Sequence, residues 1–284
     1  MKKAFLNFAA WTARILPKPV IYLIYKVKPL AGFIRRNLNK AAPSGLSEVK
    51  IAAGSLAGYT IQLDMQVDKD YWLGTYEQEL QAALPLLVPA GATIYDVGAN
   101  IGYVSLLLAK ATGAEGKIFA FEALPANIQQ LNRNVELNGK ESMVTVVPVA
   151  VTDQQGQVKF LVHASGGMGK AVGSAGRQDP YLSEILVDSL SLDDYVYKLG
   201  NPPPAVIKMD IEGGEVLALP GMTRILKEIH PMLLMELHGP ESSRAAWEHL
   251  TSAGYTLSWM KAGFPPVNSL DEMGWKAYIV ARHA

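Results

Sequence analysis

The sequence contains no cysteine. That absence excludes disulfide frameworks, thiolate metal sites, iron–sulfur clusters and cysteine nucleophiles, and a reducing cytoplasm fits it. Long hydrophobic runs are missing too: no uncharged apolar stretch near the N-terminus reaches the roughly 18 residues of a transmembrane helix. With 49% hydrophobic and 18% charged residues, the composition is that of a globular protein with a sizeable core, which excludes a disordered or low-complexity chain.

Acidic side chains are absent from the first 47 residues. Nine Lys and Arg precede the first acid, Glu48, and because the net charge is +0, the rest of the chain carries −9. An acidic body argues against nonspecific nucleic-acid binding, so we expect no nucleic-acid partner. The segment starts as Met1-Lys2-Lys3, as a signal peptide would, but Arg14 interrupts its apolar part and no convincing cleavage site follows.

The basic segment, residues 1–47, is predicted to be an amphipathic helical arm, followed by one domain at residues 48–284. Phe8, Trp11 and Ile15 are spaced three and four apart, so one helical face carries them. Aromatic side chains among cations suit the interface of an anionic membrane, which would make the protein cytoplasmic and peripheral on the inner face of a membrane. The alternative is an arm that packs on the acidic body or on a second subunit in a homodimer.

Residues 48–64 are predicted to form a short β-hairpin. From residue 76 onward, strand-like and helix-like segments alternate. This alternation predicts an α/β fold with a doubly wound, mainly parallel sheet, in which the last two strands form an antiparallel edge. Residues 163–180 hold five glycines and are predicted to be a surface loop and lid, with Lys170 and Arg177 able to meet anionic groups. The predicted strands are residues 93–97, 117–122, 144–151, 206–210, 232–237, 256–260 and 277–281, and the predicted helices are residues 76–87, 101–111, 125–138, 215–229 and 241–253.

The strongest motif is the strand-turn-helix segment Thr93-Ile94-Tyr95-Asp96-Val97-Gly98-Ala99-Asn100-Ile101-Gly102. Its glycines suit a tight turn where the backbone approaches a ligand, and the carboxyl end of a strand is where doubly wound folds bind ligands. The dinucleotide pattern G-x-G-x-x-G fails, because Asn100 and Tyr103 stand at the second and third glycine positions. A pyrophosphate site and a nicotinamide oxidoreductase are therefore disfavoured.

Asp96 can instead attract a cationic amino group, directly or through water. Twenty residues after Gly102, Glu122 ends the next strand, where a carboxylate can accept hydrogen bonds from both ribose hydroxyls and reject a 2′-phosphate. The pattern therefore predicts a pocket for S-adenosylmethionine (SAM). The pocket residues are Asp96, Gly98, Asn100, Gly102 and Glu122.

Over roughly residues 70–240 the sequence resembles the FkbM family of class I SAM-dependent methyltransferases. The resemblance lies in Asp96–Gly102, Phe121-Glu122-Ala123, the block Ile207-Lys208-Met209-Asp210-Ile211-Glu212-Gly213-Gly214-Glu215, and Met235-Glu236-Leu237-His238. One mild departure is Gly214, where the family usually has a small apolar residue. The resemblance implies a Rossmann-like seven-stranded sheet, SAM as methyl donor and, most often, O-methylation in natural-product or glycan pathways.

Further cofactor contacts follow from this resemblance. Ala123 belongs to the second motif. Class I methyltransferases contact adenine after the third strand, where Val151 and Asp153 stand, although Asp153 is equally a turn residue. Glu77 precedes the helix that would cover the methionine end of the cofactor; an exposed acid at a helix start is the alternative.

The candidate catalytic residues are predicted at the ends of two neighbouring strands. Asp210 would orient the acceptor or the sulfonium end of SAM, and His238 has the most suitable unperturbed pKa for a base. Lys208 would pair with Asp210 or Glu236. The remaining acid, Glu212, either joins the site or only charges a helix N-terminus.

The sequence indicates less about a metal ion and about the methyl acceptor. Asp210, Glu236 and His238 are also a hard-ligand set for a divalent cation; that alternative is open, and no metal is part of the predicted site. The predicted function is O-methylation of a hydroxyl on a sugar, lipid-linked or polyketide-like acceptor. The alternatives are a protein side-chain (lysine) methyltransferase acting on a membrane partner and a non-catalytic SAM-binding scaffold.

Overall fold

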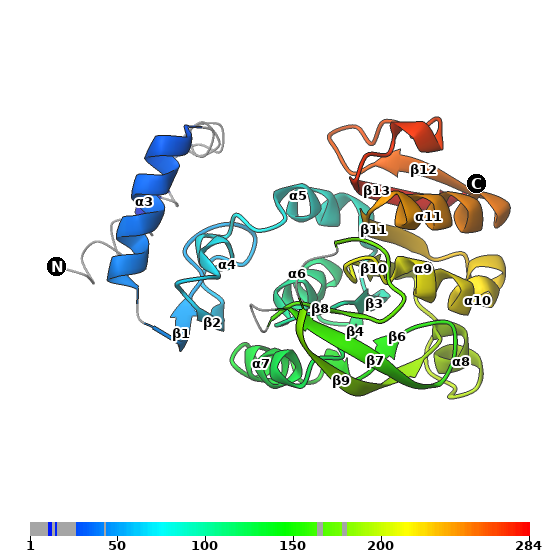
Figure 1. Cartoon of the computed structure of the whole chain (residues 1–284), viewed down its shortest axis with the longest axis horizontal. Helices are drawn as coiled ribbons and strands as arrows, with labels where there is room; N and C mark the ends of the chain where they lie inside the picture. The colour runs from blue at the N-terminus through cyan, green and yellow to red at the C-terminus, as the bar shows by residue number, and fades with distance from the viewer. Residues whose placement is uncertain (1–10, 13–14, 16–26, 43, 164–166, 178–180) are drawn as a thin grey trace. The chain divides into compact units, whose positions relative to one another are not determined.

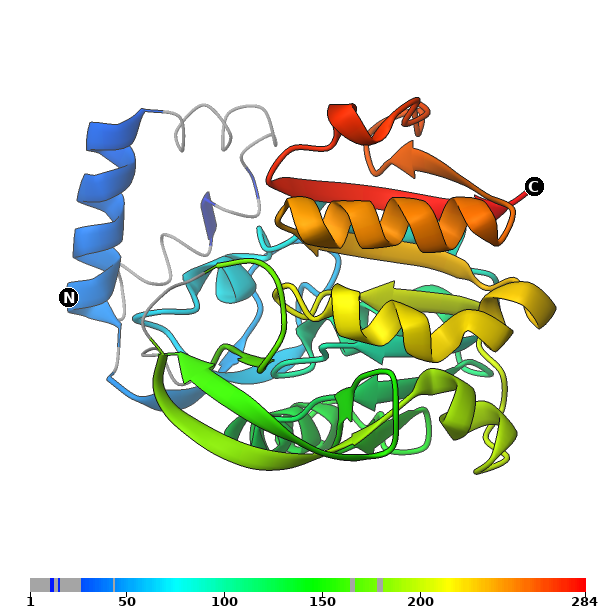
Figure 2. The ribbon, with the colours of Figure 1, turned by 45° about the vertical axis from the view of Figure 1, so that its right-hand side comes forward.

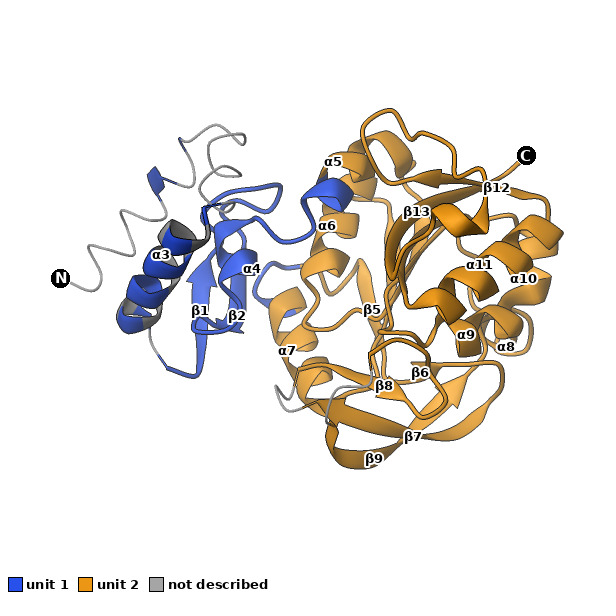
Figure 3. Cartoon of the chain, turned by 45° about the horizontal axis from the view of Figure 1, so that its top comes forward, with its two compact units in different colours: residues 1–81, 136–139 blue, residues 82–135, 140–284 orange. Residues whose placement is uncertain are grey.

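The computed structural model describes residues 11–12, 15, 27–42, 44–163, 167–177 and 181–284 (Figure 1). The chain forms two compact units, one of residues 1–81 with 136–139 and the other of residues 82–135 with 140–284 (Figure 3). The division at residue 47 stays a prediction. Among the described residues, no helix combines the length and the apolar character needed to cross a membrane.

The first unit contains the predicted hairpin. Strands β1 (Leu46–Lys50) and β2 (Thr60–Asp64) pair antiparallel, which confirms it, with boundaries shifted by a few residues. The side chain of Asn138 accepts from the Thr60 amide at 3.0 Å and donates to its carbonyl at 2.7 Å, so residues 136–139 belong with this unit. The unit also holds α3 (Lys28–Ala41), α4 (Lys69–Leu73) and the start of α5 (Gln78–Leu87).

Most of the predicted basic arm lies outside the described residues, including Phe8. Its described part contains α3, which begins with a proline in the first turn, where the missing amide hydrogen has no helical partner anyway. Trp11, Ile15 and Phe33 are exposed. The membrane role of the arm stays a prediction.

The second unit is built on a seven-stranded sheet in the order β12-β13-β11-β10-β3-β4-β5, parallel except for β13. The α/β prediction is confirmed, and so is the antiparallel pairing of the last two strands. The strand bounds are β3 Thr93–Val97, β4 Lys117–Phe121, β5 Val144–Val147, β10 Val206–Met209, β11 Met232–His238, β12 Tyr255–Trp259 and β13 Lys276–His283.

Helices cover both faces of this sheet (Figures 2 and 3). On one face lie α6 (Tyr103–Thr112) and α7 (Pro125–Glu136); on the other lie α8 (Leu192–Tyr197), α9 (Glu215–Ala218), α10 (Thr223–Glu228) and α11 (Pro240–Ser252). Alternate strand residues such as Tyr95, Ile207 and Leu233 form the core beneath the second group, as the period of two requires.

The predicted helix 215–229 is interrupted. A 3₁₀ turn, η1 (Leu219–Met222), separates α9 from α10. Pro220 lacks an amide hydrogen, and Gly221 packs so closely that a Cβ there would lie 2.3 Å from the Thr152 carbonyl oxygen. The break is therefore set by packing as well as by proline.

The prediction of a loop over residues 163–180 is wrong in part. A second sheet, β6-β9-β7-β8, includes β8 (Gly169–Ala171) within that range, and β7 (Gly156–His163) and β9 (Tyr181–Leu190) flank it. The glycines in this range favoured a loop, so β8 was not predicted, although apolar residues alternate along β7. The predicted strand 144–151 is divided between β5 and β6 (Ala150–Val151), because Pro148 between them has no amide hydrogen for the sheet.

Candidate active site

The glycine turn after β3 packs directly on the end of β10. Gly98 has φ +79°, a left-handed conformation that favours glycine. A Cβ on Gly98 would lie 1.9 Å from the Asp210 carbonyl oxygen. The Asp210 amide in turn donates to the Val97 carbonyl at 3.1 Å. The predicted ligand turn and the predicted catalytic strand end are therefore adjacent at one edge of the sheet.

Glu122 holds the same turn in place. Its carboxylate accepts from the Asn100 amide at 2.8 Å and from the amides of Ala123 and Leu124 at 3.0 and 2.8 Å. These bonds keep Asn100 in its left-handed conformation at φ +50°. Burial raises the pKa of Glu122, against the hydrogen bonds from the amides and from Asn127. A carboxylate offers about four acceptor positions, and these amides with Asn127 already use most of them. The bonds from Glu122 to a ribose therefore stay a prediction.

Asp96 is paired within the protein. It is fully buried, and its carboxylate accepts from the Ser105 hydroxyl at 2.6 Å and lies 3.3 Å from Lys208 Nζ. Lys208 also donates to the Gly98 carbonyl at 3.0 Å. The parallel register places Lys208 opposite Asp96, a partner that was not predicted. Lys208 also lowers the pKa of Asp210, and its pairing with Asp210 or Glu236 stays a prediction. The buried pair of Asp96 and Lys208 therefore supports the turn after β3.

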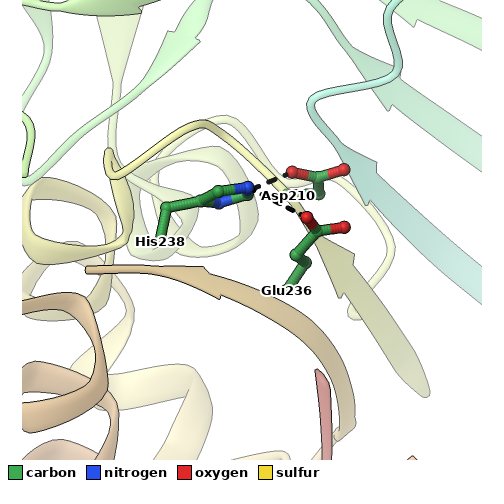
Figure 4. Close-up of side chains that lie close together, drawn as sticks. All are labelled: Asp210, Glu236 and His238. Carbon is green, nitrogen blue, oxygen red and sulfur yellow. Dashed lines mark ion pairs between the residues drawn. The ribbon is translucent and has the colours of Figure 1, made fainter. Parts of the chain in front are cut away.

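His238 is the last residue of β11, and carboxylates surround its imidazole (Figure 4). Its Nε2 atom lies 2.9 Å from Glu236 Oε1 and 3.8 Å from Glu212 Oε2. Its Nδ1 atom lies 3.9 Å from Asp210 Oδ1 and 3.8 Å from Glu215 Oε1. The strand ends of β10 and β11 thus bring the four predicted catalytic acids and bases together, as their parallel arrangement requires.

The members of this cluster differ in exposure and in charge. The side chains of Asp210 and Glu212 are 19% and 31% exposed, whereas that of His238 is 3% exposed. Burial, with Glu236 and Glu212 nearby, raises the pKa of Asp210 to about 7, against the effects of Lys208 and His238. Burial opposes a charged imidazole, but Glu215 and Glu236, with Asp210 and Glu212, outweigh it and raise the pKa of His238 to about 10.

Two partners of the cluster were not predicted, the buried Glu215 and the exposed Lys276. Glu215 is fully buried; it accepts from the Ser242 hydroxyl at 2.8 Å and from the Ile211 amide at 3.2 Å. Lys276 pairs with Glu236 because β13 runs antiparallel to β11, with Lys276 opposite His238. Only the repeated acids in residues 210–215 could have drawn attention to Glu215, and nothing local indicates Lys276.

The segment after β8 packs on the cluster. The Ala175 amide donates to the Gly213 carbonyl at 2.9 Å, and a Cβ on Gly176 would lie 3.3 Å from His238 Cβ. Lys170, expected to meet anionic groups, is buried and donates to the carbonyls of Ala175 and Arg177. That expectation is corrected: Lys170 fastens the segment, while Arg177 is exposed, with its guanidinium 5.8 Å from the Trp275 ring centroid.

Comparison with known proteins identifies the family of this chain. Residues 96–262 match the methyltransferase FkbM domain family. The chain belongs to that family. It is a SAM-dependent methyltransferase, and the resemblance seen in the sequence is confirmed.

Individual relatives of this FkbM-domain protein are distant. It is 25% identical over 190 residues to the hexuronic acid methyltransferase AglP of Haloferax volcanii, covering 64% of this chain and 72% of that protein. The methyltransferase FkbM structure from Methylobacillus flagellatus matches 76% of the chain at 17% identity and a TM-score of 0.44. A SAM-dependent O-methyltransferase from Thermotoga maritima matches 74%, at 12% identity and a TM-score of 0.43. The chain spans 56% and 66% of those two chains.

The turn fits SAM, the donor that the family uses. Gly98 and Gly102 are both left-handed, and a Cβ on either would clash with Asp210 or Leu131. Glycine therefore keeps this turn tight at the carboxyl end of β3, where doubly wound folds bind ligands. Glu122 places a buried carboxylate at the end of β4, next to that turn. These residues, with Asn100, would hold the nucleoside part of the donor.

Three predicted cofactor contacts lie outside the turn after β3 and the end of β4. Glu77 lies in the first unit, in a left-handed conformation. Val151 is buried in β6, and Asp153 is exposed on the turn that packs against Gly221. Their contacts with SAM stay predictions.

Proposed function

We propose that this FkbM-domain protein transfers the methyl group of SAM to an oxygen atom of a sugar-like acceptor. The observation that supports the proposal is the contact between the Gly98 turn and Asp210, because it brings the turn predicted to bind the donor and the carboxylate cluster to one edge of the sheet. A hexuronic acid methyltransferase among its relatives supports a sugar acceptor.

SAM, when bound, supplies an electrophilic methyl group: the acceptor oxygen bonds to the methyl carbon while the carbon–sulfur bond breaks and its electron pair stays on sulfur. The protein must hold the acceptor oxygen about 3 Å from the methyl carbon and in line with the breaking bond. Asp210 is suited to orient the acceptor, because it adjoins the Gly98 turn and its side chain is partly exposed.

A hydroxyl acceptor must also lose its proton. Glu212 has the more exposed carboxylate and can pass a proton to solvent, so we assign it that role. His238, predicted as the base, is almost completely buried, with its Nε2 held by Glu236. We therefore assign His238 a positioning role between Glu236 and Asp210.

The test offers the full-length protein SAM with an isotopically labelled methyl group and either a hexuronic acid glycoside or the matching hexose glycoside. We expect a labelled sugar product, with Glu212→Gln lowering turnover at least about tenfold and the exposed control Glu248→Gln leaving it unchanged. Mild alkali distinguishes the acceptor atom, since a methyl ester hydrolyses and a methyl ether survives. Labelling of a protein lysine without sugar labelling would refute the proposal.

We also propose that residues 1–47 place the enzyme on an anionic membrane surface. Their nine cations and the exposed Phe33 support it. The full chain should float with anionic vesicles, should not float with neutral ones, and should be released by salt. Equal flotation with both vesicle types would contradict the electrostatic part of this proposal.

A further inference from the structure

We propose that Asp210, Glu236 and His238 bind a divalent cation of the Mg²⁺ or Mn²⁺ class. The three side chains come from adjacent strand ends, Asp210 directly after β10 and the other two within β11 (Figure 4). In β11, Glu236 and His238 are two residues apart and therefore share one face of the sheet. The site itself stands on geometry alone; only its catalytic use depends on the proposed function.

The spacing of the ligand atoms suits a single ion. One atom from each of the three residues can be chosen so that all lie within 4.8 Å of one another. Two ligands of one ion lie at most twice the metal–ligand distance apart, which is about 4.2 Å for Mg²⁺ and about 5 Å for the larger Ca²⁺. The 4.8 Å limit exceeds the Mg²⁺ value by about 0.6 Å, so the side chains must move closer together to bind Mg²⁺ or Mn²⁺.

The imidazole of His238 provides a second, independent observation. Its side chain is 3% exposed, and Nδ1 makes no hydrogen bond. The nearest carboxylate oxygens, on Asp210 and Glu215, stand 3.9 and 3.8 Å away, beyond normal hydrogen-bond length. Leaving a buried polar atom without a partner costs roughly 1–3 kcal/mol. An ion that replaces the Nδ1 proton would bind Nδ1 and Asp210 together. To join them, Glu236 would turn away from Nε2, from which its Oε1 lies 2.9 Å.

The charges around His238 leave an excess of negative charge. Four carboxylates, those of Asp210, Glu212, Glu215 and Glu236, surround one imidazole. Lys208 pairs with Asp96 and also acts on Asp210, and Lys276 pairs with Glu236 from a position that is 41% exposed. Lys276 can therefore compete with an ion for Glu236, or turn towards solvent when one binds.

The ligand types define the class of ion. Two carboxylates favour Mg²⁺ and Mn²⁺, and the imidazole also suits softer metals such as Zn²⁺. A six-coordinate ion would keep further positions for water or for acceptor oxygens. If the proposed function holds, the ion binds the acceptor oxygen, lowers the pKa of a hydroxyl there and orients it, while Glu212 receives the released proton.

The test titrates MnCl₂ into the full-length protein after chelation and dialysis at pH 8, followed by calorimetry and by the electron paramagnetic resonance of free Mn²⁺. We expect one saturable site per chain that Mg²⁺ competes for. Asp210→Asn and Glu236→Gln should each weaken Mn²⁺ binding at least about tenfold, while Glu248→Gln should not. Lys276→Met should retain or tighten binding, because it removes a competing cation from Glu236.

Thermal unfolding of each variant separates loss of the site from loss of the fold. Wild-type protein that binds no Mn²⁺, or ligand variants that bind like wild type, would overturn the proposal. Because binding is measured without methyl transfer, the two proposals fail separately. Mn²⁺ binding without sugar methylation would remove only the acceptor, whereas methylation that persists in EDTA without Mn²⁺ binding would remove only the ion.

Discussion

Substitution of Gly98 by alanine tests whether contact with the end of β10 builds the donor site. Gly98 has φ +79°, and a Cβ would lie 1.9 Å from the Asp210 carbonyl oxygen. A left-handed alanine costs roughly 1–2 kcal/mol, and overpacking that shifts backbone adds about 1–3 kcal/mol. Gly263 supplies a matched control, because its φ is also +79° but a Cβ there would meet nothing within 4 Å.

Both variants carry the conformational cost, and only Gly98→Ala carries the steric one. For a domain of this size 1 kcal/mol corresponds to about 2–4 °C in Tm. Gly98→Ala should therefore lower Tm by about 2–12 °C more than Gly263→Ala does, measured by calorimetric scanning. It should also weaken SAM binding at least about tenfold, since the turn must move away from Asp210. Equal Tm values together with an unchanged Kd for SAM would refute the reasoning.

Three further substitutions test the surroundings of the site. Asp96→Asn should lower the free energy of unfolding by about 3–5 kcal/mol by leaving Lys208 without its buried partner; adding Lys208→Met should restore most of it, and denaturant titrations that show no recovery would contradict the pairing. Glu122→Gln should raise the Kd for SAM about tenfold in calorimetry, because an amide cannot accept from all the backbone donors that Glu122 serves; an unchanged Kd would exclude that role. Gly221→Ala, whose Cβ would lie 2.3 Å from a backbone carbonyl, should lower stability by about 1–3 kcal/mol without changing SAM affinity, and a wild-type Tm would show that η1 can yield.

Local patterns predicted the donor turn well. The run from Asp96 to Gly102 is contiguous, and its strand, turn and helix follow from periodicity and glycine placement alone. Pairing was harder to predict, because the period of two in a strand says which residues share a face but not which residue stands opposite. The pair of Lys208 and Asp96 was missed for this reason, because it depends on register, which places these two residues opposite each other.

The covering segment shows a second limit. Five glycines in residues 163–180 indicate a loop when read by themselves, yet Gly169 lies in β8, where a Cβ would meet Phe160 at 2.5 Å. Glycine there reflects close packing and not flexibility. Lys170 was expected to meet anionic groups, but it is buried and donates to the carbonyls of Ala175 and Arg177.

By itself the sequence determined the strands of the seven-stranded sheet, the position of the glycine turn and the strand ends that carry the acids. These features depend on residues close in the chain, where backbone geometry and side-chain period act directly. The second sheet, with β7, β8 and β9, was not predicted. Only the tertiary structure decided that β13 inserts beside β11 and brings Lys276 to Glu236, and that Glu215 closes the cluster behind His238. Those contacts depend on strand order and register, which the whole core selects by packing.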